Sequence, residues 1–188
     1  MFDMRVAMAV FALLVLLAGA ADYKVGERLA PAAEDKATAY KEVNWDDLLP
    51  KGWDPMKLIN ELKLDKLKDS DPRAMEAMEK LKRMWSEAPS NPAMNGKAIR
   101  IAGFMVPLEW GRREVKEFLL VPYFGACIHV PPPPPNQIIY GVYDKGFKLN
   151  HLQEAFWLTG LLKTTLTEND VATSAYTLQV ADIKPYTE

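Results

Sequence analysis

Residues 97–107 read Lys-Ala-Ile-Arg-Ile-Ala-Gly-Phe-Met-Val-Pro, and their pattern decides the expected fold. Two sets of residues alternate along this stretch: Ala98, Arg100, Ala102 and Phe104 on one side, and Ile99, Ile101, Gly103 and Met105 on the other. A period of two predicts a β-strand. Gly103 within it indicates a bulge or bend, and Pro107 ends the strand because proline has no N–H to donate.

Four later segments have the same character: residues 115–121, 137–143, 154–163 and 173–181. They are short, rich in β-branched and aromatic residues, and separated by turn signals, which favours a small barrel or half-barrel. Gly160 lies in the middle of the fourth segment, where a barrel needs a strong bend. The sequence therefore predicts an α+β fold with an OB-like five-stranded barrel over residues 95–187.

Helical patterns precede the barrel and predict a helical cap over residues 39–90. The clearest helix covers residues 72–86, with Asp71 as N-cap and Pro72 at the first helical position. Its apolar residues recur every three or four positions, and we expect this stripe to pack on the barrel; they are Met75, Met78, Leu81 and Trp85. A weaker helical pattern covers residues 55–66, and Asn44 is placed to cap a turn over 45–49.

The first twenty residues are typical of an export signal. Arg5 precedes an apolar run over residues 6–17, and Ala18-Gly19-Ala20 follows as a cleavage site. The run is short for a membrane span, although an uncleaved anchor is the alternative. We expect cleavage after Ala20, a flexible segment over 21–38, a periplasmic protein without a lipid-anchor cysteine, and no stable membrane insertion after cleavage.

The composition is that of a folded domain. The chain has 188 residues, 49% hydrophobic and 26% charged, which argues against disorder and favours one domain over residues 39–188. The net charge is -2 and no basic stripe is present, so the sequence predicts no nucleic-acid partner.

Residues 121–137 contain the chemistry that stands out. This stretch holds the only cysteine, Cys127, and one of two histidines, His129, followed by prolines at 131–135. The prolines favour a stiff polyproline II segment. We take this loop as the candidate binding site, with five residues named for it: Tyr123, Cys127, His129, Asn136 and Gln137.

The same stretch resembles a known family. The run Gly125-Ala-Cys-Ile-His-Val-Pro-Pro-Pro-Pro134, together with 95–108 and 118–124, is similar to the bacterial exported family known as domain of unknown function 3299. The resemblance extends over about residues 42–187. It implies a small periplasmic or lipid-anchored protein, with some relatives encoded near transport systems, and it implies no particular activity.

Three functions compete for the loop. The first is a zinc or copper site, because thiolate and imidazole suit these metals and Cys127 and His129 share a face if the segment is extended. Two ligands are too few for a closed zinc site. A third or fourth would come from His151, Glu109, Asp144 or a second subunit.

The second function is an accessory or binding protein of an envelope or transport system, whose partner is an envelope protein or a transporter component. A polyproline segment and one face of an OB-like barrel both present preformed binding surfaces. A single cysteine cannot form an internal disulfide in an oxidising compartment, so Cys127 is buried, bound or open to a partner thiol.

The third function is a thiol enzyme with Cys127 as nucleophile and His129 as base. Same-face neighbours on a strand lie roughly 7 Å apart, which is long for such a pair. The remaining alternative is structural: Cys127 is a small buried side chain, and Asn136 and Gln137 tie down the end of a rigid loop.

Overall fold

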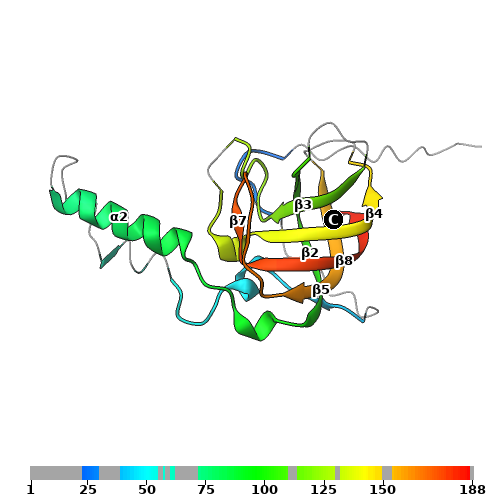
Figure 1. Ribbon diagram of the computed structural model, residues 1–188, viewed down its shortest axis with the longest axis horizontal. Helices are drawn as coiled ribbons and strands as arrows, with labels where there is room; N and C mark the ends of the chain where they lie inside the picture. Colours follow the sequence, from blue (N-terminus) through cyan, green and yellow to red (C-terminus); the bar gives the residue numbers. More distant parts are fainter. Residues whose placement is uncertain are drawn as a thin grey trace, which may run out of the picture.

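The computed structural model describes residues 23–29, 39–54, 57, 60–61, 72–109, 114–129, 132–149 and 154–186. Five strands form the body of the protein (Figure 1): β2 Lys97–Pro107, β3 Val115–Val121, β4 Ile139–Phe147, β5 Ala155–Lys163 and β8 Tyr176–Pro185. The sheet runs β2-β3-β4-β8-β5 and closes because β5 also pairs with β2. Only β4 and β8 are parallel in this ring. The expected α+β, OB-like five-stranded barrel is confirmed.

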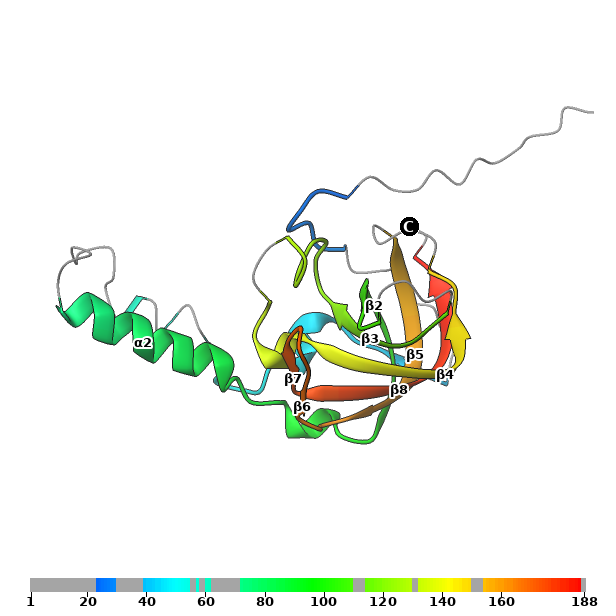
Figure 2. The ribbon, with the colours of Figure 1, turned by 45° about the horizontal axis from the view of Figure 1, so that its top comes forward.

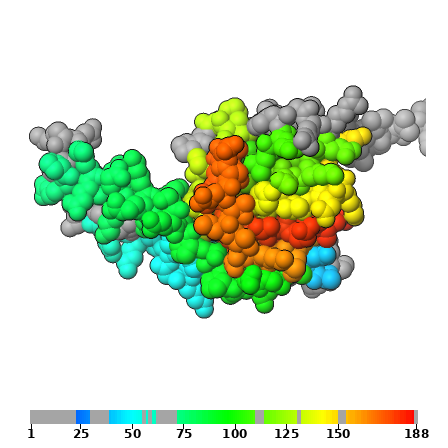
Figure 3. All heavy atoms as spheres, in the orientation of Figure 1, coloured from blue at the N-terminus to red at the C-terminus, as the bar shows by residue number. Residues whose placement is uncertain are grey.

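Short strands and 3-10 helices lie around the five barrel strands. They are β1 Lys41–Glu42, η1 Trp45–Leu48, η3 Pro92–Met94, η4 Pro135–Gln137, β6 Thr167–Glu168 and β7 Thr173–Ser174. Strand β1 runs parallel to β2, and β6 pairs with β7 in a separate hairpin. The single strand expected over residues 173–181 is therefore divided between β7 and β8. In the space-filling view, the orange residues of this region form a ridge on the barrel beside the base of helix α2 (Figure 3).

Alternation along each strand separates an inner from an outer apolar layer. Ile99, Ile101 and Phe118 belong to the inner layer. Phe104 and Leu119 belong to a second cluster on the outside of the barrel. Both layers exclude water, so the barrel wall is buried on two sides over part of its surface.

Residues 23–29 cover part of the outer cluster. The Gly26 N–H donates to the Phe124 carbonyl at 2.8 Å, and the Phe124 N–H donates to the Glu27 carbonyl at 3.1 Å. The Tyr23 ring meets the Phe104 ring edge-on at a centroid distance of 4.9 Å. Within the segment 21–38, for which the sequence predicts flexibility, residues 23–29 are paired with the loop, and residues 21–22 and 30–38 lie outside the described residues.

Helix α2 covers Pro72–Ser86, as predicted, but it does not cap the barrel. It extends away from the strands (Figures 1 and 2). The residues Met75, Met78 and Trp85 are 67%, 46% and 40% exposed, so the prediction that this stripe packs on the barrel is wrong. The helix instead buries Ala77, on the neighbouring part of its apolar arc.

Other predictions for the N-terminal half are only partly covered by the structure. Residues 57, 60 and 61 of the expected 55–66 helix are helical, and the rest of that pattern lies outside the described residues, as do Asp71 and residues 1–22. The turn after Asn44 is the short helix η1, and the Asn44 N–H donates to Asp47 Oδ2 at 2.8 Å. Among the described residues, no helix has the length and apolar character needed to cross a membrane.

Candidate functional site

A pocket of about 310 Å³ opens on the outer surface of the barrel, between the N-terminal segment, the turn before and within η1, and strand β5. Its walls include aromatic, small and charged side chains: Arg28, Leu29, Val43, Asn44, Trp45, Asp46, Asp47, Ala102, Pro122 and Trp157. This combination of apolar walls and a few polar groups is typical of small-ligand sites.

The barrel supplies one side of the pocket. Ala102 on β2 pairs with Trp157 on β5, and both take the outward positions of their strands. The Arg100 guanidinium lies 3.9 Å from the Trp157 ring centroid and 3.0 Å from the Glu42 carboxylate. These contacts fix the Trp157 indole. The ion pair with Glu42 holds the Arg100 guanidinium in place, and the guanidinium over the ring favours one orientation of the indole.

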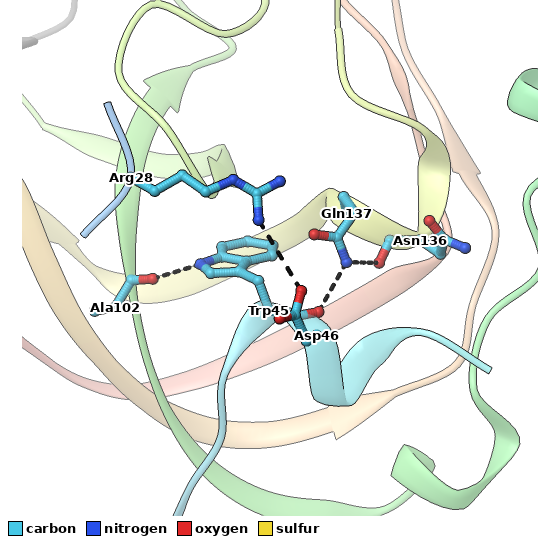
Figure 4. Close-up of polar contacts among 6 residues, drawn as sticks. All are labelled: Arg28, Trp45, Asp46, Ala102, Asn136 and Gln137. Carbon is cyan, nitrogen blue, oxygen red and sulfur yellow. Dashed lines mark hydrogen bonds and ion pairs between the residues drawn. The ribbon is translucent and has the colours of Figure 1, made fainter. Parts of the chain in front are cut away.

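Trp45 forms the facing wall, and two hydrogen bonds hold it (Figure 4). Its indole Nε1 donates to the Ala102 carbonyl at 2.7 Å. Its own carbonyl accepts a hydrogen bond from Gln137 Nε2 at 2.8 Å. The aromatic wall is therefore positioned before any ligand arrives, which lowers the ordering cost of binding.

Two oppositely charged side chains, Arg28 and Asp46, lie at the rim of the pocket. Arg28 Nη1 lies 4.0 Å from Asp46 Oδ1, and the two side chains are 58% and 83% exposed. An exposed ion pair at this distance contributes little stability, so either partner can exchange the contact for a ligand at small cost. Arg28 reaches this place because its backbone forms an antiparallel bridge with Tyr123.

Asn136 and Gln137 do not line the pocket but support the chain segments next to it. Both are buried, at 0% and 5% exposed. Asn136 Nδ2 donates to the Pro89 carbonyl at 3.1 Å, while Gln137 holds Trp45. Both amides are covered by the chain and position the turn at 45–48 and the segment before β2. That they contact a ligand stays a prediction.

Cys127 and His129 lie on a turn. Cys127 has a φ of 64°, and the His129 N–H donates to the Gly125 carbonyl at 2.8 Å. The premise that the segment is extended, with both side chains on one face, is therefore wrong. His129 is exposed, with its ring 6.5 Å from that of Phe124.

Among the described residues, no further metal ligand joins this pair. Within the described ranges, no group of three or more His, Cys, Asp or Glu side chains could hold a metal ion, so neither Glu109 nor Asp144 completes a site. His151 lies outside the described residues. A zinc or copper site at Cys127 and His129 stays a prediction.

Burial determines the chemistry of Cys127. It raises the pKa of the thiol to about 11, so the thiol is protonated at neutral pH and is a poor nucleophile. The pKa of the Tyr123 hydroxyl is also raised, mainly by burial and further by Cys127, whereas Arg28 lowers it. Tyr123 thus lies between the cysteine turn and the pocket rim.

This pKa leads to a test of thiol reactivity. We expect Cys127 to react with iodoacetamide at pH 8 roughly tenfold more slowly than a free cysteine peptide. A thiol pKa about two units above that of the free peptide lowers the thiolate fraction about a hundredfold. The more basic thiolate is intrinsically more nucleophilic, which restores about a factor of ten in rate. The rate should rise with pH until the thiol titrates near pH 11. Mass spectrometry of timed samples measures it; a rate that levels off below pH 9 would contradict burial of the thiol.

Comparison with known proteins places the chain in a family. A model of a family of proteins of unknown function, DUF3299, matches residues 45–185, which includes all five barrel strands and the turn that carries Trp45. The chain belongs to the DUF3299 family. A crystal structure of a DUF3299 family protein from Pseudomonas aeruginosa PAO1 is similar, with 33% sequence identity and a TM-score of 0.62. The match covers 80% of this chain and 99% of that one. A search among curated proteins gave no match.

Sequence reasoning missed most of the pocket. In the sequence, Trp45 is only the first residue of the predicted turn over 45–49, and Arg28 lies in a segment with no periodic pattern. Trp157 and Ala102 belong to predicted strands, but strand pairing is needed to bring them together. The predicted loop contributes Pro122 to the lining and Gln137 to its support.

Proposed function

We propose that this DUF3299 protein is an exported binding protein of the bacterial envelope, and that its ligand occupies the pocket between Trp45 and Trp157. The observation that carries the proposal is the fixed position of Trp45, whose indole donates to the Ala102 carbonyl and whose own carbonyl accepts from Gln137, beside an open Arg28–Asp46 pair. Preformed aromatic walls with a few charged groups favour binding of a small molecule.

The lining points to a class of ligand. Arg28 suits a carboxylate, Asp46 suits an ammonium group, and two indoles suit an apolar or aromatic side chain. A molecule that carries all three features is a free amino acid, or a dipeptide that presents both of its termini. A volume of about 310 Å³ is at the small end for ligand sites, which agrees with this size.

The cellular role rests on the sequence. The export signal over residues 1–20 supports a periplasmic location, and the family resemblance supports an accessory role in an envelope or transport system. The Gly-Ala-Cys-Ile-His-Val-Pro run belongs, in this proposal, to the loop that borders the site through Pro122. The zinc or copper alternative at Cys127 and His129 is tested by titrating either metal against Cys127→Ser.

The proposal predicts which charges matter. We expect calorimetric titration of the chain from Ala21 with amino acids and short peptides to identify a binder. Arg28→Gln and Asp46→Asn should each weaken that binder roughly 10- to 100-fold, because each removes one charge-assisted hydrogen bond worth about 1.5–3 kcal/mol.

Two matched substitutions serve as controls. Arg83→Gln and Asp170→Asn make the same chemical changes at exposed positions outside the pocket lining. We expect both to bind like the wild type. If the rim variants and the controls bind equally well, the ligand does not use this pocket.

A further inference from the structure

The exposed side of helix α2 forms a shallow hollow of about 660 Å³. Among the described residues, its lining belongs to the helix itself: Met78, Glu79, Leu81, Lys82, Arg83, Trp85 and Ser86. The helix stands clear of the barrel in both ribbon views (Figures 1 and 2), so a partner can reach it without meeting the strands. The strands provide no cover for Met78 and Trp85, which are 46% and 40% exposed.

The spacing of these residues is that of a helix-packing site. Met78, Leu81, Lys82 and Trp85 are at positions i, i+3, i+4 and i+7, the four residues that form a hole for one side chain of a facing helix. A hollow of this kind accepts a knob from another helix, because ridges and grooves on two helices interdigitate at such positions.

The charges beside the hole favour a second copy of the same helix. Lys82 lies within the apolar stripe and Glu79 on its border, and Lys82 Nζ is 3.2 Å from Glu79 Oε1. When two copies of α2 lie antiparallel, with the two-fold axis near residue 80, Met78 of each copy faces the hole of the other. The same arrangement brings Met75 opposite Trp85 and places Glu79 next to the other copy's Lys82.

We propose that α2 is a self-association surface, and that two copies of the protein pair through antiparallel α2 helices. The contact is isologous, since one patch meets itself. A membrane surface fits less well, because Lys82 lies within the stripe and the acidic Glu79 borders it. The proposal is independent of the pocket, which lies on the barrel.

Sedimentation velocity over a concentration series tests the pairing. For the chain from Ala21 we expect a weak dimer, with a Kd of about 10–100 μM, because one pair of helices buries a small interface. Met78→Lys should remove the dimer, since it places a second lysine beside Lys82 of the other copy in the facing hole. Leu166→Lys makes a matched change at an exposed apolar position outside α2 and should leave the dimer intact.

Exchange of the charged pair gives a second test. Glu79→Lys and Lys82→Glu should each weaken the dimer roughly tenfold, and the double exchange should restore it, because each cross-helix contact then regains opposite signs. Helical circular dichroism of every variant separates lost pairing from a lost helix. A wild type that stays monomeric, a dimer that survives Met78→Lys, or binding of a monomer to phosphatidylglycerol vesicles would each overturn the proposal.

Discussion

Replacing Gly160 with alanine is expected to destabilise the barrel by about 3 kcal/mol or more. Gly160 lies at the irregularity where β5 pairs with β8. A Cβ atom at this position would meet the Gln179 carbonyl oxygen at 2.3 Å and the Leu178 side chain at 3.1 Å. Because the first of these atoms is backbone, relief requires β5 and β8 to move apart, which weakens their hydrogen bonds.

Urea unfolding of the variant measures this loss. Gly52→Ala is the matched control: a Cβ there meets nothing within 4 Å, and its φ of 83° makes it strained without a clash. We expect the control to cost only about 1 kcal/mol. Equal losses for the two variants would mean that β8 does not approach β5 as closely as described.

Gln137→Leu should lower both stability and ligand affinity. Its amide is the donor to the Trp45 carbonyl, so its loss leaves a shielded acceptor unpaired and costs about 2 kcal/mol. Trp45 then loses one of the two hydrogen bonds that hold it. We expect ligand affinity at the pocket to fall roughly tenfold, because the free protein must order this wall on binding.

Urea unfolding and calorimetric titration of the same preparation measure the two effects together. Gln179→Leu is the matched control, because Gln179 is exposed and makes only a long contact of 3.5 Å to Asp144. We expect it to change neither quantity by more than experimental error. Unchanged affinity in Gln137→Leu would show that the Trp45 wall does not depend on this amide.

The barrel could be predicted because its signals are local. Period-two alternation marked β2 through Ile99, Ile101 and Met105, and Pro107 ended it where the structure does. Strand β3 and helix α2 have the predicted bounds, since alternation and a proline at the first helical position are each visible within a few residues.

What failed depended on contacts between distant parts of the chain. A stripe such as Met75, Met78 and Trp85 shows that a helix has an apolar side, but the pattern does not show what covers it. The turn at Cys127 follows from a left-handed backbone conformation that non-glycine residues rarely adopt, so an extended segment was the natural expectation. The pocket required Arg28, Trp45 and Trp157 to meet through pairing across more than a hundred residues.

Fluorine NMR of the chain labelled with 5-fluorotryptophan tests the ligand site most directly. The sequence has five tryptophans, and single Trp→Phe variants assign their signals. On addition of the amino acid or peptide that binds best, we predict that the signals of Trp45 and Trp157 shift together and saturably, while that of Trp85 on α2 stays unchanged. Saturable binding that moves neither Trp45 nor Trp157 would contradict a ligand site between them.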